Sequence, residues 1–142
     1  MPGMTSDIDI RKLIPQREPI LMVDSLIAYD PDGARTEFTV PAGNLFVRDG
    51  VLAEPGIIEH IAQSAAAWGG YPFFIEGRDP VPGYIGEIKD FSIIARPAVG
   101  SVLKTTLKVL GSASGTTLMQ SIVTAGEQEV ALGRIKIHIG EK

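Results

Sequence analysis

Residues 54–73, EPGIIEHIAQSAAAWGGYPF, predict one long helix that is apolar on nearly every side. Pro55-Gly56 at its start and Gly69-Gly70 at its far end are breakers, so we expect the helix to stop near Gly69-Gly70. A helix without a broad polar face belongs inside a protein. We therefore expect the rest of the chain to surround this helix on most sides.

The remainder of the chain reads mainly as strands separated by turn residues. The last stretch alternates apolar and polar side chains, and this period of two is typical of a strand with one buried face. A hairpin, one long buried helix and an antiparallel run of strands form an α+β arrangement. The expected elements are a short helix after Ser6, strands at Ile20–Tyr29, Ala34–Val40, Tyr84–Ile94, Val102–Leu110, Thr116–Thr124 and Val130–Ile139, and a loop at Pro41–Ala53.

Composition excludes several classes of protein. The chain has 142 residues, which we interpret as a single domain over residues 1–142, and 44% of them are hydrophobic. The formal net charge is −4 without a basic cluster, so we expect no nucleic-acid partner. There is no cysteine and there are only two histidines, so we expect no metal site. The N-terminus lacks a signal-peptide pattern and no apolar run is long enough to span a membrane, which together predict a cytoplasmic protein.

Four motifs give the chain a resemblance to a known family. They are LIPQREPILMVD at residues 13–24, EHIAQ at residues 59–63, GEIKDF at residues 86–91 and RPAVG at residues 96–100. In this order and spacing they resemble the 3-hydroxyacyl-acyl-carrier-protein dehydratases. The resemblance covers nearly the whole chain and implies a hotdog fold, in which an antiparallel sheet wraps around one long central helix.

One catalytic position of that family differs here. The family carries a histidine ahead of the helix, in a His-Phe-Pro-Gly segment, whereas this chain has Leu45 at that position, followed by Phe46. The histidine usual in the opening motif is replaced by Gln16. The resemblance is therefore to a divergent branch of the family that lacks the usual catalytic histidine.

Glu59 and Gln63 are the candidate catalytic residues. They lie one turn apart on the apolar helix, so they point to the same side. A carboxylate is costly to bury, and Glu59 is therefore a candidate general acid or base, with a structural carboxylate near a dimer interface as the alternative. Gln63 could orient Glu59, hold a water or a substrate hydroxyl, or bond a loop carbonyl.

Three further residues are candidates for substrate binding. Gly56 lies in the first turn of the helix, whose free amides could polarise a thioester carbonyl, although Pro-Gly could simply start the helix. Asn44, in the loop that replaces the histidine segment, could supply a polar group or make a turn. His60 follows Glu59 and points ~100° away around the helix, which favours a partly buried histidine bonded to a loop over a substrate contact.

The resemblance implies an enzyme, a lyase that removes water from a 3-hydroxyacyl thioester of acyl carrier protein or CoA in fatty-acid or polyene-type lipid metabolism. It implies no metal or redox cofactor, and a homodimer or an oligomer of dimers with the acyl chain between subunits. Two alternatives stay open. One is a hotdog thioesterase, in which Glu59 activates water. The other is a non-catalytic subunit that binds acyl thioesters or completes a heterodimer.

Overall fold

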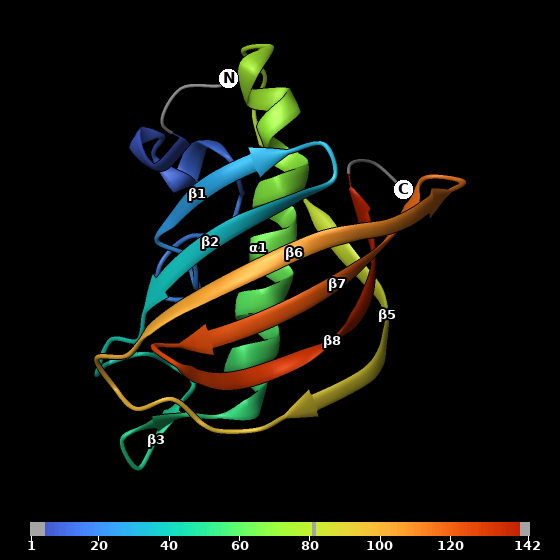
Figure 1. Ribbon diagram of the computed structural model, residues 1–142. Coiled ribbons are helices and arrows are strands. Elements are labelled where there is room, and N and C mark those ends of the chain that lie inside the picture. Colours follow the sequence, from blue (N-terminus) through green and yellow to red (C-terminus); the bar gives the residue numbers. More distant parts are fainter. Residues whose placement is uncertain (1–4, 81, 140–142) are drawn as a thin grey trace.

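The computed structural model describes residues 5–80 and 82–139, in which an antiparallel sheet curves around one long helix (Figure 1). This confirms the α+β arrangement. In chain order the elements are the 3₁₀ turns η1 (Thr5–Asp7) and η2 (Ile10–Lys12), strands β1 (Ser25–Asp30), β2 (Gly33–Thr39), β3 (Val47–Arg48) and β4 (Val51–Leu52), helix α1 (Glu54–Ile75), and strands β5 (Gly83–Ile93), β6 (Val102–Ala113), β7 (Thr116–Ala125) and β8 (Gln128–Ile139).

The main sheet has six strands in the order β1-β2-β6-β7-β8-β5, with antiparallel neighbours throughout. Its strands show the alternation expected for one buried face. On β6, for example, Leu103, Thr105 and Leu107 are buried, whereas Lys104 and Lys108 are exposed. The register shifts within four strand pairs, β1–β2, β5–β8, β6–β7 and β7–β8. Such bulges bend the strands that carry them. The sheet can therefore curl around α1.

Two apolar clusters explain why α1 has almost no polar face. The first lies between α1 and the sheet, where Ile57 and Ile61 belong to the same buried cluster as Leu103, Met119 and Ile135. The second lies against the N-terminal segment and is formed by Ile10, Leu13, Ile14, Val23, Leu26, Ala34, Ala66 and Ala67. Because each fully buried large aliphatic side chain contributes roughly 1.5–3 kcal/mol, burial on two sides holds the helix in place.

The end of α1 differs from the prediction. The helix does not stop at Gly69-Gly70 but continues to Ile75, through Pro72. Gly70 is needed for packing rather than for a turn, because a Cβ at this position would overlap the backbone carbonyl of Leu13. The chain turns away from the helix just after its end, at Gly77, which has a φ of 73°. The amides of Gly77 and Arg78 bond the carbonyls of Phe74 and Phe73, which is a Schellman cap.

The segments before β1 and between β2 and α1 also differ from the sequence interpretation. The N-terminal segment makes two 3₁₀ turns instead of one short helix, and Asp9 rather than Ser6 caps the second turn through the amide of Arg11. The strand expected from Ile20 begins only at Ser25. The loop at 41–53 contains the small β3–β4 hairpin, whose turn residues Asp49 and Gly50 both have positive φ. Within residues 5–80 and 82–139, no helix is long and apolar enough to cross a membrane.

Candidate active site

The predicted pair, Glu59 and Gln63, is in direct contact. Gln63 Nε2 donates to Glu59 Oε2 at 2.7 Å. Gln63 is fully buried, whereas Glu59 is only partly buried. Among the described residues, Glu59 Oε1 has no hydrogen-bond donor. One carboxylate oxygen is therefore held in place while the other is available to a ligand.

Gln63 is oriented by the segment just before β1. Its Oε1 accepts from the amide of Met22 at 2.6 Å, and its Nε2 also donates to the carbonyl of Ile20 at 2.8 Å. The amide of Met22 can only donate, which fixes which end of the Gln63 side chain faces it. Gln63 thus both orients Glu59 and satisfies a loop carbonyl, two of the functions left open by the sequence. With its donors and its acceptor occupied, it is better suited to positioning Glu59 than to binding substrate.

His60 lies on the other side of the same segment. Its Nδ1 lies 2.7 Å from the carbonyl oxygen of Met22, and its Nε2 lies 2.6 Å from Thr105 Oγ1. Because a carbonyl can only accept, Nδ1 carries the proton and Nε2 accepts from the hydroxyl of Thr105. Burial lowers the pKa of His60 to about 4, so the imidazole is neutral at pH 7. A fully buried ring with both nitrogens bonded contradicts the substrate-binding role and supports the alternative, a histidine that anchors a loop.

The buried imidazole makes stability depend on pH. The pKa of His60 in the folded chain lies below its unfolded value of 6.5, so the unfolded chain binds a proton more tightly than the folded chain does. A falling pH therefore favours unfolding. We expect the free energy of unfolding to fall by about 2 kcal/mol between about pH 8 and about pH 5, measured by urea denaturation. A His60→Gln variant should lose this part of the dependence of stability on pH. Equal slopes in wild type and His60→Gln would contradict the assignment.

Gly56 and Asn44 are placed in contacts within the chain. The amide of Gly56 donates to the carbonyl of Ala53 at 2.9 Å, and a Cβ here would lie 2.6 Å from Phe46 Cβ and 2.7 Å from Leu52 Cδ1. The amide of Gly56 therefore already has an acceptor within the chain, and the close packing favours the alternative, the start of a tightly packed helix. Polarisation of a carbonyl by the first-turn amides stays a prediction.

Asn44 makes the turn that was one of its two predicted roles. Its Oδ1 accepts from the amide of Phe46 at 2.8 Å, and its Nδ2 faces Met22 Sδ at 3.1 Å. Its substrate contact stays a prediction.

Met22 is the residue that the sequence interpretation missed. Its amide is bonded by Gln63, its carbonyl by His60 and its sulfur by Asn44. Only its place in the opening motif drew attention to it, because two of these contacts use backbone atoms that every residue carries. The segment around Met22 is therefore the support on which Gln63, and through it Glu59, is positioned.

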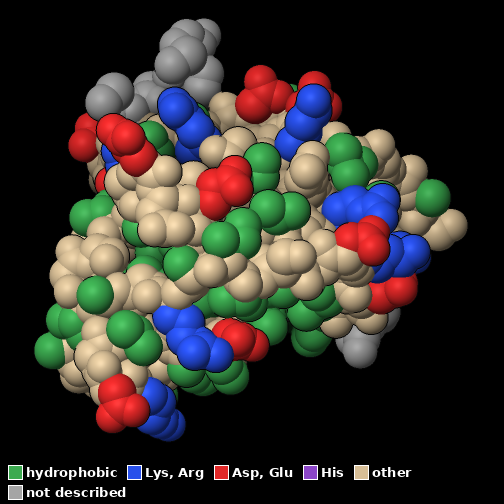
Figure 2. All heavy atoms as spheres, turned by 60° about the horizontal axis from the view of Figure 1, so that its bottom comes forward, with side chains coloured by type: hydrophobic (Ala, Val, Ile, Leu, Met, Phe, Trp, Pro, Cys, Tyr) green, Lys and Arg blue, Asp and Glu red, His purple; other side chains and the backbone are tan. Residues whose placement is uncertain are grey.

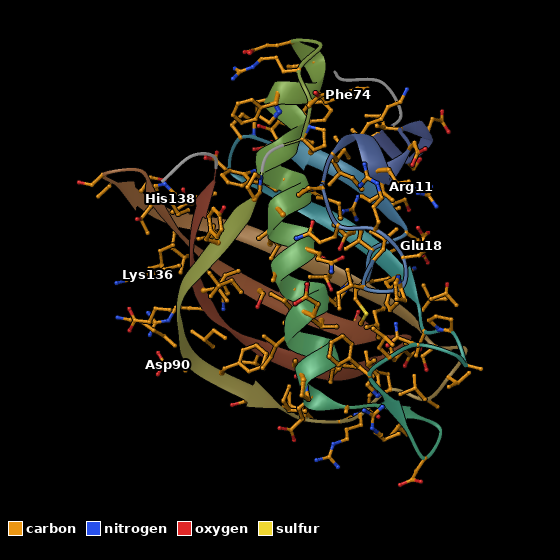
Figure 3. All side chains as sticks on the ribbon, turned by 180° about the vertical axis from the view of Figure 1, so that it is seen from behind. Arg11, Glu18, Phe74, Asp90, Lys136 and His138 are labelled. Carbon is orange, nitrogen blue, oxygen red and sulfur yellow. The ribbon has the colours of Figure 1, made fainter. Side chains whose placement is uncertain are left out.

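Glu59 lies on the one face of α1 that the chain leaves partly open. Pro55 is exposed and Ile58, Glu59 and Ala62 are partly exposed, at spacings that place them on one side of the helix. Seen from behind, α1 lies in front of the sheet, between the N-terminal segment and β5 (Figure 3). A cavity of about 360 Å³ opens at the start of α1 and is lined by Pro55, but not by Glu59. Glu59 therefore lies outside this cavity, on the partly open face of α1.

The antiparallel sheet around one long central helix defines a hotdog fold. Residues 8–141 match the ApeP-like family, described as ApeP dehydratase, and the chain belongs to this family. No match is found among curated protein sequences.

Solved structures support the same fold. The dehydratase heterocomplex ApeI:P from Xenorhabdus doucetiae superimposes with a TM-score of 0.84 at 16% identity, covering 95% of this chain and 93% of that one. Cj0977, a sigma28-regulated virulence protein from Campylobacter jejuni, gives a TM-score of 0.73 at 15% identity and covers 100% and 93%. A hypothetical thioesterase from Streptococcus pneumoniae, crystallised with coenzyme A, gives 0.63 at 10% identity and covers 82% and 85%. The predicted hotdog fold is confirmed.

Proposed function

We propose that this chain acts in a dehydratase that removes water from a 3-hydroxyacyl thioester, with Glu59 as its acid–base residue. The observation that carries the proposal is the carboxylate of Glu59, which is held through one oxygen by Gln63 and left open at the other. Membership of the ApeP-like dehydratase family supports the reaction class. The family match does not identify the substrate, so the thioester of acyl carrier protein or CoA is part of the proposal alone.

The reaction balances with one proton transferred and one returned. A base removes the proton on the carbon next to the thioester carbonyl, and the electron pair of that C–H bond forms the double bond. The C–O bond to the 3-hydroxyl breaks, and the oxygen leaves as water after it receives a proton. Glu59 is suited to take the first proton, and the same carboxyl can return it to the departing hydroxyl.

A second chain would complete the site. The carbonyl oxygen gains charge as the proton leaves, and a hydrogen-bond donor facing it lowers the barrier. His60 is unsuited to this role because both of its nitrogens are occupied by Met22 and Thr105. We infer that the donor comes from a partner that covers the open face of α1.

The surface around this face has the character of an interface. β5 is an edge strand of 11 residues beside that face, and a long unpaired edge invites pairing with another chain. Hydrophobic side chains gather at the end of the molecule where α1 begins and β3 lies (Figure 2). Leu45 and Ile94 are each 48% exposed and Val99 is 37% exposed. A second hotdog chain, either another copy or a homologue as in the ApeI:P heterocomplex, would cover such a surface.

Product analysis tests the reaction. The protein, alone and after co-purification with any hotdog subunit of its host, is incubated with 3-hydroxyacyl thioesters of CoA and of acyl carrier protein. We expect an enoyl product, lighter by one water, with its thioester bond intact. Release of free thiol, including from substrates without a 3-hydroxyl, would instead establish the thioesterase alternative.

The non-catalytic alternative makes a different prediction. If the chain only completes a heterodimer, a partner would turn over the substrate at the same rate with wild-type protein and with a variant that lacks the carboxylate of Glu59. A rate that depends on that carboxylate excludes this alternative.

A further inference from the structure

A pocket of about 380 Å³ lies at the C-terminal end of α1, far from Glu59. Its lining includes Arg11, Lys12, Arg17 and Arg78, together with Phe74 and a single acidic residue, Asp79. We call this group the basic pocket. Arg11 and Glu18 lie side by side near this end of the helix, below Phe74 (Figure 3). From Glu59 to Phe74 the helix rises by ~22 Å, so the basic pocket is separate from the candidate active site.

The cations of the basic pocket are not needed to cap the helix. Positive side chains often gather at helix C-termini because the last carbonyls lack partners. Here the carbonyls of Phe73 and Phe74 already accept from the amides of Glu76, Gly77 and Arg78. Backbone amides therefore already satisfy these two carbonyls, so the cations are not needed to cap them.

Among the described residues, two of the four cations, Lys12 and Arg17, make no ion pair with a carboxylate. Arg11 is paired with Asp9 and Glu18, at 3.3 and 2.7 Å. Arg78 is paired with Glu76 at 3.2 Å. Lys12 has no ion-pair partner among the described residues.

Arg17 is held in place without losing its charge. Its Nη1 donates to the carbonyls of Ile14 and Gln16, each at 2.8 Å, and its Nη2 donates to the carbonyl of Arg11 at 3.1 Å. These neutral acceptors fix the guanidinium without neutralising it. A guanidinium ordered before a ligand arrives loses less entropy when it binds one.

The basic pocket also has an aromatic side. Phe74 lines it, and the guanidinium of Arg78 lies 4.5 Å from the ring centre of the neighbouring Phe73. The volume suits a small organic ligand rather than a bare ion. Guanidinium groups match the geometry of phosphate oxygens, and Phe74 can cover an apolar part of the same molecule.

We propose that the basic pocket binds an organic phosphate ester, with the phosphate facing Lys12 and Arg17 and the organic part against Phe74. The identity of the ester rests on the proposed function. The carrier of a thioester is itself an organic phosphate ester, either free coenzyme A or the phosphorylated arm of a carrier protein. The binding itself requires no turnover and no contact with Glu59.

Calorimetric titration of the purified full chain tests the proposal with coenzyme A, pantetheine, which lacks phosphate, and inorganic phosphate. Coenzyme A should bind about tenfold or more tightly than pantetheine, because pantetheine lacks the charged group. Inorganic phosphate should compete with coenzyme A, and higher salt should weaken binding. Equal affinity for coenzyme A and pantetheine would overturn the proposal.

Charge variants locate the binding. Lys12→Glu and Arg78→Gln should each weaken coenzyme A binding, the first by about tenfold or more. The matched control is Lys108→Glu, at an exposed position on β6 that does not line the basic pocket, and this variant should bind as wild type. Both lysine positions are exposed and neither side chain has an ion-pair partner among the described residues, so folding should be preserved. Unchanged binding in both pocket variants would overturn the proposal.

A second experiment identifies the source of the phosphate. It compares binding of carrier protein that bears its phosphorylated arm with binding of the same carrier protein without that arm. If the arm is the source, only the armed carrier should bind, and Lys12→Glu should weaken it. A Glu59→Gln variant should bind coenzyme A as wild type does. Loss of binding in Lys12→Glu with turnover intact in Glu59→Gln would refute the proposed function and leave the phosphate site standing.

Discussion

Replacing Glu59 by glutamine is expected to lower the rate of dehydration by about 10²–10⁴-fold, because a positioned acid or base contributes that much to proton transfer. The amide oxygen of a glutamine can still accept from Gln63 Nε2, which donates at 2.7 Å in the wild type. The helix, the segment around Met22 and the fold should therefore be preserved. The measurement is the initial rate of enoyl-thioester formation, with circular dichroism and thermal unfolding recorded on the same protein.

Glu54→Gln is the control for the loss of a carboxylate on the same helix. Glu54 is exposed in the first turn and pairs with Arg96 at 3.0 Å, an ion pair at the surface that contributes little to stability. This variant should keep the wild-type rate within about twofold. A Glu59→Gln protein that is folded and as fast as the control would remove Glu59 from the mechanism.

Replacing Gly70 by alanine is expected to destabilise the protein, although alanine is the better helix former. In a free helix this change would stabilise by ~1 kcal/mol. Here the added methyl group overlaps the carbonyl oxygen of Leu13, and overpacking of this kind costs ~3 kcal/mol or occasionally more. Leu13 and Ile14 are fully buried, so their segment cannot move away without exposing apolar surface. The net loss should be ~2 kcal/mol or more, read from urea denaturation.

Gly111→Ala is the matched control for this substitution. Gly111 lies at the bulge of β6, where a Cβ would have no atom within 4 Å. Its free energy of unfolding should stay within about 0.5 kcal/mol of wild type. If Gly70→Ala were as stable as this control, the close approach of Leu13 to the helix would not be a constraint on the fold.

The start of α1 was predictable and its end was not, for a physical reason. Pro55 is tolerated in the first turn because the amide it lacks would have no partner there, so its signal is local. The pair Gly69-Gly70 carries an ambiguous signal, since glycine serves both at helix ends and where two backbones touch. The approach of Leu13, 57 positions earlier in the chain, decides between the two.

The same distinction applies to the candidate active site. The spacing of Glu59 and Gln63 placed them on one side of the helix, and the structure joins them. The partners of His60, by contrast, are Met22 and Thr105, which lie 38 and 45 positions away. No local pattern could identify them, and one of the contacts uses a backbone carbonyl. The contacts of Gly56 and Asn44 within the chain likewise come from neighbours that the fold brings together.

The sequence alone determined a long apolar helix, strands with one buried face and a carboxylate within the helix, because these follow from helix and strand periodicity, which is a property of neighbouring residues. Only the tertiary structure decided that the segment around Met22 supports Gln63 and that His60 is enclosed. It also decided that cations of the N-terminal segment meet Arg78, which follows α1, in one pocket. These depend on strand order and register, which bring distant backbone and side-chain atoms within bonding distance.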